Sequence, residues 1–160
     1  MPAILHNIPP VYDNDSRILI LGSFPSVASR ESKFYYGHKN NRFWKVLSHL
    51  YKETIGENPL DKQSFLIAHN IALWDVIKSC DICGSLDSSI KNVTVNDIKS
   101  IITDSNISRV YTNGKTSDML YKKYILSDVG IEAICLPSTS SANASFSFED
   151  LCGKWSMILN

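Results

Sequence analysis

Four consecutive apolar residues, Ile-Leu-Ile-Leu at positions 18–21, end abruptly at a Gly-Ser-Phe-Pro-Ser turn. An unbroken apolar run of this length is typical of a strand buried on both faces, as in parallel sheets that are covered by helices. The turn cluster from Gly22 to Ser26 then stops the strand. In open α/β sheets, ligands bind in the loops that follow the strand ends. The run therefore predicts a parallel sheet with a candidate site in residues 22–44.

Short apolar strands alternate with helical segments along the rest of the chain. The expected strands cover residues 17–22, 71–76, 109–112 and 131–136. The expected helices, whose apolar residues recur at steps of three and four, cover residues 41–55, 60–69, 94–104, 115–125 and 148–159. Strands that alternate with helices form parallel sheets covered on both faces. The pattern therefore predicts an α/β fold, a three-layer α/β/α sandwich with a central four-stranded parallel sheet.

Two stretches interrupt this alternation. Residues 1–16 are expected to form an irregular lead-in, because Pro9 and Pro10 bar regular structure. Residues 80–92 contain Gly, Ser, Asp and Asn in close succession and are expected to form a polar loop. With 160 residues the chain is long enough for one core and short for two, so residues 1–160 are expected to be a single domain.

The chain carries 16 basic and 16 acidic side chains, for a formal net charge of zero. This balance argues against broad electrostatic coating of nucleic acid, although it is compatible with local contacts to a few phosphates. No apolar run reaches 18 residues, and the N-terminus lacks the basic start and long apolar centre of a signal peptide. The expected location is therefore the cytoplasm, with no membrane contact.

Cys80 and Cys83 have the CxxC spacing of zinc and iron–sulfur ligands. A complete site usually needs four ligands, and no second CxxC or CxxH pair is present in the sequence. The alternative is a pair of ordinary reduced cysteines, which a cytosolic chain favours. The sequence therefore predicts no metal and no cofactor.

Polar clusters follow all four expected strands. They are residues 22–26, Asp75, residues 113–114 and residues 137–143. Because the carboxyl ends of parallel strands meet at one edge of a sheet, we expect the clusters to form one pocket. The alternative is that they are simply turns, which also favour Ser, Asn, Gly and Pro. The sequence contains no GxGxxG, GxxxxGK[ST] or GxSxG motif, so it predicts neither a nucleotide-phosphate cradle nor a nucleophile elbow.

Four motifs occur at these strand ends: GSFPS, YYGHKNNRFW, LWDV followed by CGSLDSSIKN, and LPSTSSANA. Together they resemble the uracil-DNA glycosylase superfamily. They are most similar to family 6, the hypoxanthine-DNA (deoxyinosine) glycosylases, and the first loop also resembles that of the mismatch-specific uracil/thymine-DNA glycosylases. The resemblance covers residues 17–150. It implies an enzyme of base excision repair that flips a deaminated base, most of all hypoxanthine, out of DNA and hydrolyses its glycosidic bond.

The resemblance implies that an asparagine is the catalytic residue. The catalytic amide of the mismatch-specific enzymes belongs to a GINPG motif, and its position falls on Phe24 here. Family 6 is expected to use the asparagine of an H-P-x-N-x-F-W segment, which matches Asn41, with Asn40 as the fallback. Lys39 replaces the proline of that segment, and Leu136 replaces the histidine of the classical H-P-S motif. Without that histidine a purine, which can leave with the help of ring protonation, fits better than uracil.

The resemblance also implies a pocket for the flipped base. Tyr36 matches the aromatic residue that stacks on the base, and Asp75 ends the strand at which the superfamily recognises the base edge. A carboxylate accepts the N1–H of hypoxanthine and is repelled by the lone pair on adenine N1. The expected pocket residues are Gly22, Ser23, Phe24, Tyr36, His38, Asp75 and Asn113. From the residues alone, Asn41 could instead cap a helix, Tyr36 could belong to the core, and Asp75 and Asn113 could be turn residues.

Hydroxyl and backbone N–H groups after the fourth strand suit contacts to DNA phosphates. The expected DNA-binding residues are Ser26, Lys39, Arg42, Ser138, Thr139, Ser140, Ser141 and Asn143. A Ser-rich turn without DNA contact is the alternative. No lysine stands where Schiff-base chemistry would need one, so we expect a monofunctional glycosylase that acts as a monomer at the nucleoid.

Three other functions stay open at the level of sequence. The first is a glycosylase for uracil, xanthine or another deaminated base. The second is a catalytically silent module that binds DNA or nucleotides, because the GINPG amide is missing. The third is a hydrolase of free nucleosides such as inosine.

Overall fold

Four parallel strands form the central sheet of the computed structural model, which describes residues 3–160. Across the sheet they follow the order β3 (Ile71–Asp75), β2 (Ile18–Gly22), β6 (Arg109–Asn113) and β7 (Ala133–Leu136). The register places Gly22 opposite Asp75, and Asn113 opposite Leu136. The polar residues that end the strands therefore meet along one edge of the sheet, and the predicted four-stranded parallel sheet is confirmed.

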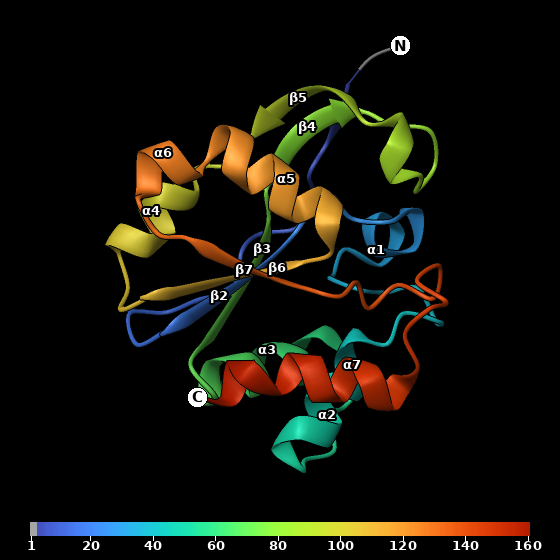
Figure 1. Cartoon of the computed structure of the whole chain (residues 1–160), viewed down its shortest axis with the longest axis vertical. Helices are drawn as coiled ribbons and strands as arrows, with labels where there is room; N and C mark the ends of the chain where they lie inside the picture. Colours follow the sequence, from blue (N-terminus) through green and yellow to red (C-terminus); the bar gives the residue numbers. More distant parts are fainter. Residues whose placement is uncertain (1–2) are drawn as a thin grey trace.

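Helices cover both faces of this sheet (Figure 1). One face carries α2 (Phe43–Tyr51), α3 (Pro59–Ala68) and α7 (Phe148–Trp155), and the other carries α4 (Ile98–Thr103), α5 (Lys115–Tyr124) and α6 (Leu126–Val129). Successive side chains of β2 point to opposite faces, so Ile18 and Ile20 join the core under α2, while Leu19 and Leu21 join the core under α4. The unbroken apolar run of β2 follows from this double burial, and the three-layer α/β/α arrangement is confirmed.

A second, smaller sheet overturns the prediction for two stretches. The expected loop at 80–92 is an antiparallel hairpin of β4 (Ile77–Asp81) and β5 (Lys91–Val95), joined through a short 3-10 turn, η1 (Asp87–Ser89). The expected irregular lead-in contributes β1 (Ile4–Leu5), which pairs with β4; residues 1–2 of that lead-in lie outside the described residues. Register shifts between β4 and β5 and the exposed Lys and Asn residues at the start of β5 break the regular alternation that would have indicated strands in the sequence.

Several boundaries also differ from the expected ones. The first loop contains a short helix, α1 (Val27–Ser32), which Ser26 caps by accepting a hydrogen bond from the N–H of Ser29. Helix α2 stops at Tyr51 because Lys52 takes a left-handed conformation. Helix α4 is shorter than the helix expected over residues 94–104 and begins after its cap, Asp97. The final helix ends at Trp155 and continues as a 3-10 turn, η2 (Ser156–Leu159).

Candidate active site

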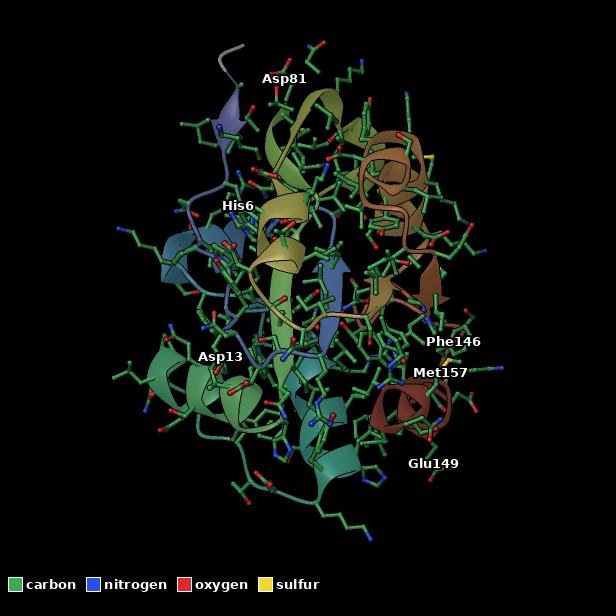
Figure 2. The ribbon with its side chains drawn as sticks, turned by 90° about the vertical axis from the view of Figure 1, so that its left-hand side faces the viewer. His6, Asp13, Asp81, Phe146, Glu149 and Met157 are labelled. Carbon is green, nitrogen blue, oxygen red and sulfur yellow. The ribbon has the colours of Figure 1, made fainter. Side chains whose placement is uncertain are left out.

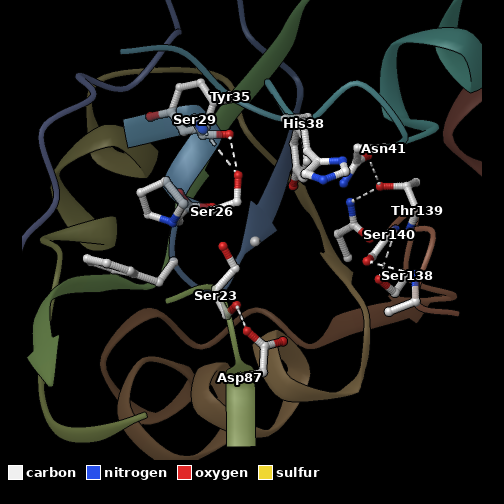
Figure 3. Close-up of a pocket in the computed structure, with 18 of the residues that line it drawn as sticks. Ser23, Ser26, Ser29, Tyr35, His38, Asn41, Asp87, Ser138, Thr139 and Ser140 are labelled. Atoms are coloured by element: carbon white, nitrogen blue, oxygen red, sulfur yellow. Dashed lines mark hydrogen bonds between the residues drawn. The ribbon is translucent and has the colours of Figure 1, made fainter. Parts of the chain in front are cut away.

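A cavity of about 310 Å³ opens at the carboxyl edge of the sheet (Figure 3). Its volume lies at the lower end of the range of small-molecule sites, roughly 300–1,000 Å³. Segments far apart in the sequence line it: the loop after β2, the end of β3, the β4–β5 hairpin, the end of β6 and the loop after β7. The four polar clusters at the strand ends therefore form one pocket, as the sequence predicts.

Most of the site residues that the sequence predicts line this cavity. All seven expected pocket residues line it, and so do Asn41 and five of the eight expected DNA-binding residues. These are Gly22, Ser23, Phe24, Tyr36, His38, Asp75, Asn113, Asn41, Ser26, Ser138, Thr139, Ser140 and Ser141. Four predicted site residues do not line the cavity: Lys39, Asn40, Arg42 and Asn143. Of the two adjacent asparagines, the structure thus places Asn41 and not Asn40 at the cavity.

Asn41 is held by a network that joins the loop before α2 to the ends of β6 and β7 (Figure 3). Its Oδ1 accepts hydrogen bonds from the N–H of Phe43 at 3.0 Å and from Oγ1 of Thr139 at 2.9 Å. Asn113 and Thr139 bond reciprocally, since Asn113 Nδ2 donates to Thr139 Oγ1 and the N–H of Thr139 donates to Asn113 Oδ1, both at 3.0 Å. Thr139 is completely buried. The network fixes the orientation of the Asn41 amide before any ligand arrives.

This network changes the chemistry that Asn41 can offer. A carbonyl oxygen has two lone pairs, and those of Asn41 Oδ1 already accept two hydrogen bonds. The hydrogen bonds among the described residues leave its Nδ2 group unused. Arg42, not Asn41, is the N-cap residue of α2; Asn41 precedes it, accepts the N–H of the first helical residue, Phe43, and still presents a hydrogen-bond donor at the cavity. The amide N–H, and not the carbonyl, is the group available for chemistry.

Asp75 ends β3 and is 3% exposed. Its Oδ2 lies 2.8 Å from Nε2 of His6, and its backbone carbonyl accepts a hydrogen bond from the side chain of Asn96 at 2.9 Å. Its other carboxylate oxygen, Oδ1, lies beside the Cα of Gly22, on the neighbouring strand. The strand end thus offers a fixed, buried carboxylate at the cavity.

Tyr36 contributes an unusual backbone conformation and an unpaired hydroxyl. Its φ of 53° is in the left-handed region, which is uncommon for a bulky side chain and is found most often where function requires it. The ring stacks on Phe43 with a centroid separation of 4.1 Å. The hydroxyl is buried and has no hydrogen-bond partner among the described residues. Burial, together with the nearby Asp75 carboxylate, raises the pKa of the Tyr36 phenol, so that it stays a protonated donor.

Arg42 holds the loop after β7 in place. Its guanidinium donates to the carbonyls of Ser140 at 2.9 Å, Asn143 at 3.2 Å and Phe146 at 2.6 Å, and more weakly to that of Thr139 at 3.5 Å. The N–H of Arg42 also donates to Thr139 O at 3.0 Å. The guanidinium of Arg42, which was predicted to contact DNA, therefore bonds backbone carbonyls of the protein itself.

Sequence reasoning missed two titratable residues at the site. His6 belongs to the lead-in that was expected to be irregular, and its partner is 69 positions away in the sequence. Asp87, in the hairpin, lines the cavity and accepts a hydrogen bond from Ser23 Oγ at 3.3 Å. Partial burial raises the pKa of the Asp87 carboxyl, and the negative charge of Asp75 acts in the same direction. The only signal in the sequence was that Asp87 belongs to the CGSLDSSIKN motif.

Residues 3–160 contain no cluster of three or more His, Cys, Asp and Glu side chains arranged to hold a metal ion. Cys80 is buried and Cys83 is exposed, and both are free thiols. None of the helices in the described part of the chain is long and apolar enough to cross a membrane.

Comparisons with known proteins agree with this geometry. A family model described as the uracil DNA glycosylase superfamily matches residues 9–153. A protein of Methanosarcina acetivorans named hypoxanthine DNA glycosylase is 34% identical over 148 residues, which is 90% of this chain and 91% of that protein. A protein of the same name from Methanosarcina barkeri is 38% identical over 138 residues, 84% of this chain and 85% of that protein.

A solved structure is also similar to the fold described above. It is a solution NMR structure of a Methanosarcina acetivorans protein presented as a candidate uracil DNA glycosylase. It superposes with a TM-score of 0.81 at 32% sequence identity, and the match covers 97% of this chain and 96% of that one.

Proposed function

The chain belongs to the uracil DNA glycosylase superfamily, and on that premise we propose that it is a monofunctional DNA glycosylase whose main substrate is hypoxanthine in DNA. It flips the deaminated base out of the duplex and hydrolyses its N-glycosidic bond as the first step of base excision repair. Two relatives named hypoxanthine DNA glycosylase support this substrate.

One observation carries the proposal: Tyr36, Asn41, Asp75 and Ser138 all line the same cavity at the strand ends. They come from three segments of the chain, the loop before α2, the end of β3 and the loop after β7, and each supplies a different function that excision of a base needs. Tyr36 offers an aromatic surface, Asn41 a polar N–H, Asp75 an acceptor for the base edge, and Ser138 a hydroxyl for a DNA phosphate. Base–aromatic stacking contributes about 1–3 kcal/mol.

The chemistry requires that water replace a base at the sugar carbon C1′. The bond between C1′ and the base nitrogen breaks first and leaves a cationic, oxocarbenium-like sugar. A water molecule then gives its hydroxide to C1′, and the departing base ends with the water's other proton. We assign to Asn41 the role of orienting this water through Nδ2–H, because Oδ1 is occupied by Phe43 and Thr139. An amide cannot act as a general base, so its contribution is orientation and electrostatics.

Asp75 gives the pocket its preference among bases. Hypoxanthine carries an N1–H donor next to the O6 acceptor, whereas adenine has a lone pair at N1. Asp75 Oδ1 accepts the N1–H of hypoxanthine, and adenine would leave that buried oxygen facing a second lone pair. Sites that recognise a polar group reject analogues that lack it, because buried polar groups are then left without a partner.

A panel of duplexes, each with one hypoxanthine, uracil, xanthine or adenine, tests the proposal. We expect fastest release of hypoxanthine by the wild type and a rate roughly 10²–10³ lower for Asn41→Ala. Asn41→Asp is the more specific variant, since it keeps the Oδ1 acceptor for Phe43 and Thr139 but replaces the Nδ2 donor by an oxygen. Wild-type excision by Asn41→Asp would mean that the hydrogen bonds of Oδ1 are the whole role of this residue.

The same panel separates the other candidate functions. Fastest release of uracil or xanthine would assign a different deaminated base to the same pocket. Binding of lesion-containing DNA without base release would identify a catalytically silent module. Cleavage of free inosine but not of DNA would identify a nucleoside hydrolase. Borohydride treatment during turnover should trap no covalent adduct, because we assign no lysine to the site.

We further propose that residues 1–160 act as one domain, as a monomer, in the cytoplasm at the nucleoid. DNA is the macromolecular partner that the proposed reaction requires. Size-exclusion chromatography with light scattering tests the monomer directly, and a dimer in that measurement would contradict it.

A further inference from the structure

The N-terminal segment brings His6 to the side of the cavity. Strand β1 pairs with β4, with Ile4 opposite Cys80, and the N–H of His6 donates to the carbonyl of Lys78 at 2.7 Å. Figure 2 shows His6 on this segment, next to helix α1. The side chain of His6 is only 2% exposed. The superfamily match begins at residue 9, so His6 lies outside the part of the chain that it covers.

Two hydrogen bonds define the tautomer of the His6 ring. The N–H of Ile8 donates to Nδ1 at 3.3 Å, and this requires a lone pair on that nitrogen. The ring proton is then on Nε2, which donates to Oδ2 of Asp75 at 2.8 Å. Phe24 and Tyr35 pack against the ring with centroid separations of 6.0 and 6.1 Å. These contacts hold the imidazole in one orientation, with Nε2 as the donor to Asp75.

We propose that His6 is a positioning residue for base recognition: it holds Asp75 as a hydrogen-bond acceptor whose Oδ1 is presented to the base. The inference rests on the proposed function. His6 Nε2 is the side-chain donor that bonds the Asp75 carboxylate among the described residues. With Oδ2 occupied in this way, Oδ1 is left beside Gly22 and the Tyr36 hydroxyl, at the cavity.

This arrangement matches the edge of a deaminated base. A lactam edge has an N–H donor next to a carbonyl acceptor, as at N1 and O6 of hypoxanthine. Asp75 Oδ1 supplies an acceptor, and the unpaired Tyr36 hydroxyl supplies a donor on the same side of the cavity. A carboxyl group that carried a proton and could turn it toward the cavity would instead donate to the N1 lone pair of adenine. By preventing this, His6 contributes to the rejection of undamaged adenine without touching the base.

The test uses four variants of the full chain in single-turnover excision assays with hypoxanthine DNA. We expect His6→Leu to lower the excision rate about 10- to 100-fold, because it removes a hydrogen bond to a charged group. The dissociation constant for DNA should change less than about twofold, since phosphate contacts dominate it. His6→Gln, whose side-chain N–H can reach Asp75, should restore most of the rate, and the shorter His6→Asn should not. Leu5→Ala, at an exposed neighbour on β1, is the matched control and should match the wild type.

A double-mutant cycle separates positioning from general stability. If His6 acts through Asp75, His6→Leu should cost little further activity in an Asp75→Ala background, where the group that it positions is absent, because residues that act on one another are not additive. Full additivity of the two losses would overturn the proposal, and so would a wild-type rate and wild-type selectivity for His6→Leu. If His6→Leu folds poorly, the excision rates of His6→Gln and His6→Asn are compared instead. Equal rates for these two variants would then overturn the proposal.

A spectroscopic measurement tests the inference without using the reaction. Long-range ¹H–¹⁵N correlation of the His6 ring in the free protein should show protonated Nε2 and unprotonated Nδ1 at neutral pH. The opposite tautomer, or averaging between the two, would overturn the proposal even if hypoxanthine were excised. A fixed Nε2–H tautomer in a protein that releases no hypoxanthine would instead contradict the proposed function alone.

Discussion

Gly22 is the residue that gives Asp75 and Tyr36 room at the floor of the cavity. A Cβ at this position would collide with Asp75 Oδ1 and would lie 3.0 Å from the Tyr36 hydroxyl oxygen. Its φ is not in the left-handed region, so the requirement for glycine here comes from space and not from backbone conformation. A methyl group in place of the glycine hydrogen would therefore displace the Asp75 carboxylate and distort the site.

Gly22→Ala should slow hypoxanthine excision by at least tenfold while it costs only about 1–3 kcal/mol of unfolding free energy, the usual cost of overpacking. The added methyl group displaces the Asp75 carboxylate from its bond with His6. Single-turnover excision and denaturant unfolding measure the two effects. Gly153→Ala, at a helical position where an added Cβ meets no atom within 4 Å, is the control and should leave both quantities unchanged or slightly improve stability. Equal behaviour of the two variants would contradict the role of Gly22.

Asp75→Asn should reduce the preference for hypoxanthine over adenine by at least about tenfold. The asparagine carbonyl can still accept the bond from His6 Nε2, and the amide N–H then faces the cavity in place of Oδ1. An N–H donor suits the N1 lone pair of adenine and opposes the N1–H of hypoxanthine. Excision rates on matched duplexes give the ratio, and Asp81→Asn, in the exposed hairpin, is the control. An unchanged ratio would remove Asp75 from base recognition.

At the scale of elements, one side chain of the loop before α2, that of Arg42, makes most of the hydrogen bonds to residues 140–146 of the loop after β7. Arg42 grips the carbonyls of residues 140, 143 and 146 with charge-assisted hydrogen bonds, which are stronger than neutral ones. The same loop carries Ser138 and Thr139 into the cavity. Arg42 thereby connects the start of α2 with the far wall of the site.

Arg42→Lys distinguishes this clamp from a phosphate contact. A lysine keeps the positive charge but lacks the planar fork that bonds several carbonyls at once. We expect Arg42→Lys and Arg42→Ala to lose similar stability, about 2 kcal/mol or more, and to slow excision together. Faster proteolysis within residues 137–147 should accompany the loss. Recovery of wild-type DNA affinity and activity by the lysine alone would favour the phosphate contact instead.

The elements differ in how far the sequence determines them. Residues 18–21 predict β2 because both faces of the strand are buried, and every position must then be apolar. The hairpin of β4 and β5 has no such pattern, since Lys78 and Lys91 face solvent and Ser and Asp residues surround them. Helix α1 spans six residues, too few for a periodic pattern to stand out.

The residues of the site also differ in how far the sequence predicts their positions. The sequence could predict that four residues meet at one edge of the sheet, because each lies at the carboxyl end of a predicted parallel strand. They are Gly22, Asp75, Asn113 and Ser138. His6 could not be placed, because its position depends on the pairing of a two-residue strand with a hairpin that the sequence does not reveal. The Asn113–Thr139–Asn41 network likewise depends on side-chain orientations that strand and helix assignments do not specify.

At the scale of the whole molecule, a formal net charge of zero limits how DNA is bound. Arg42 is committed to carbonyls, and Arg30 donates to the carbonyls of Ser26 and Gly84. Exposed cations near the cavity entrance, such as Lys39, are left for phosphates. DNA affinity should therefore depend weakly on salt.

A plot of log affinity against log salt concentration should have a slope of roughly −4 or shallower, because each neutralised phosphate contributes about −0.9. Lys39→Gln should reduce the magnitude of that slope by about one, and Lys154→Gln, on helix α7, is the control that should not. Fluorescence anisotropy with labelled duplex at several salt concentrations provides the measurement. A slope near −10 would show a far broader electrostatic contact than this charge distribution provides.

The Arg42 clamp also bears on how such a protein can change over generations. Its guanidinium bonds main-chain oxygens, which every amino acid carries, so most substitutions between residues 140 and 146 leave the clamp intact. Mutations there can alter which lesions or neighbouring nucleotides are favoured without loss of the fold. The segment is thus a natural place for diversification, and a randomised library confined to it should yield many stable proteins with new preferences.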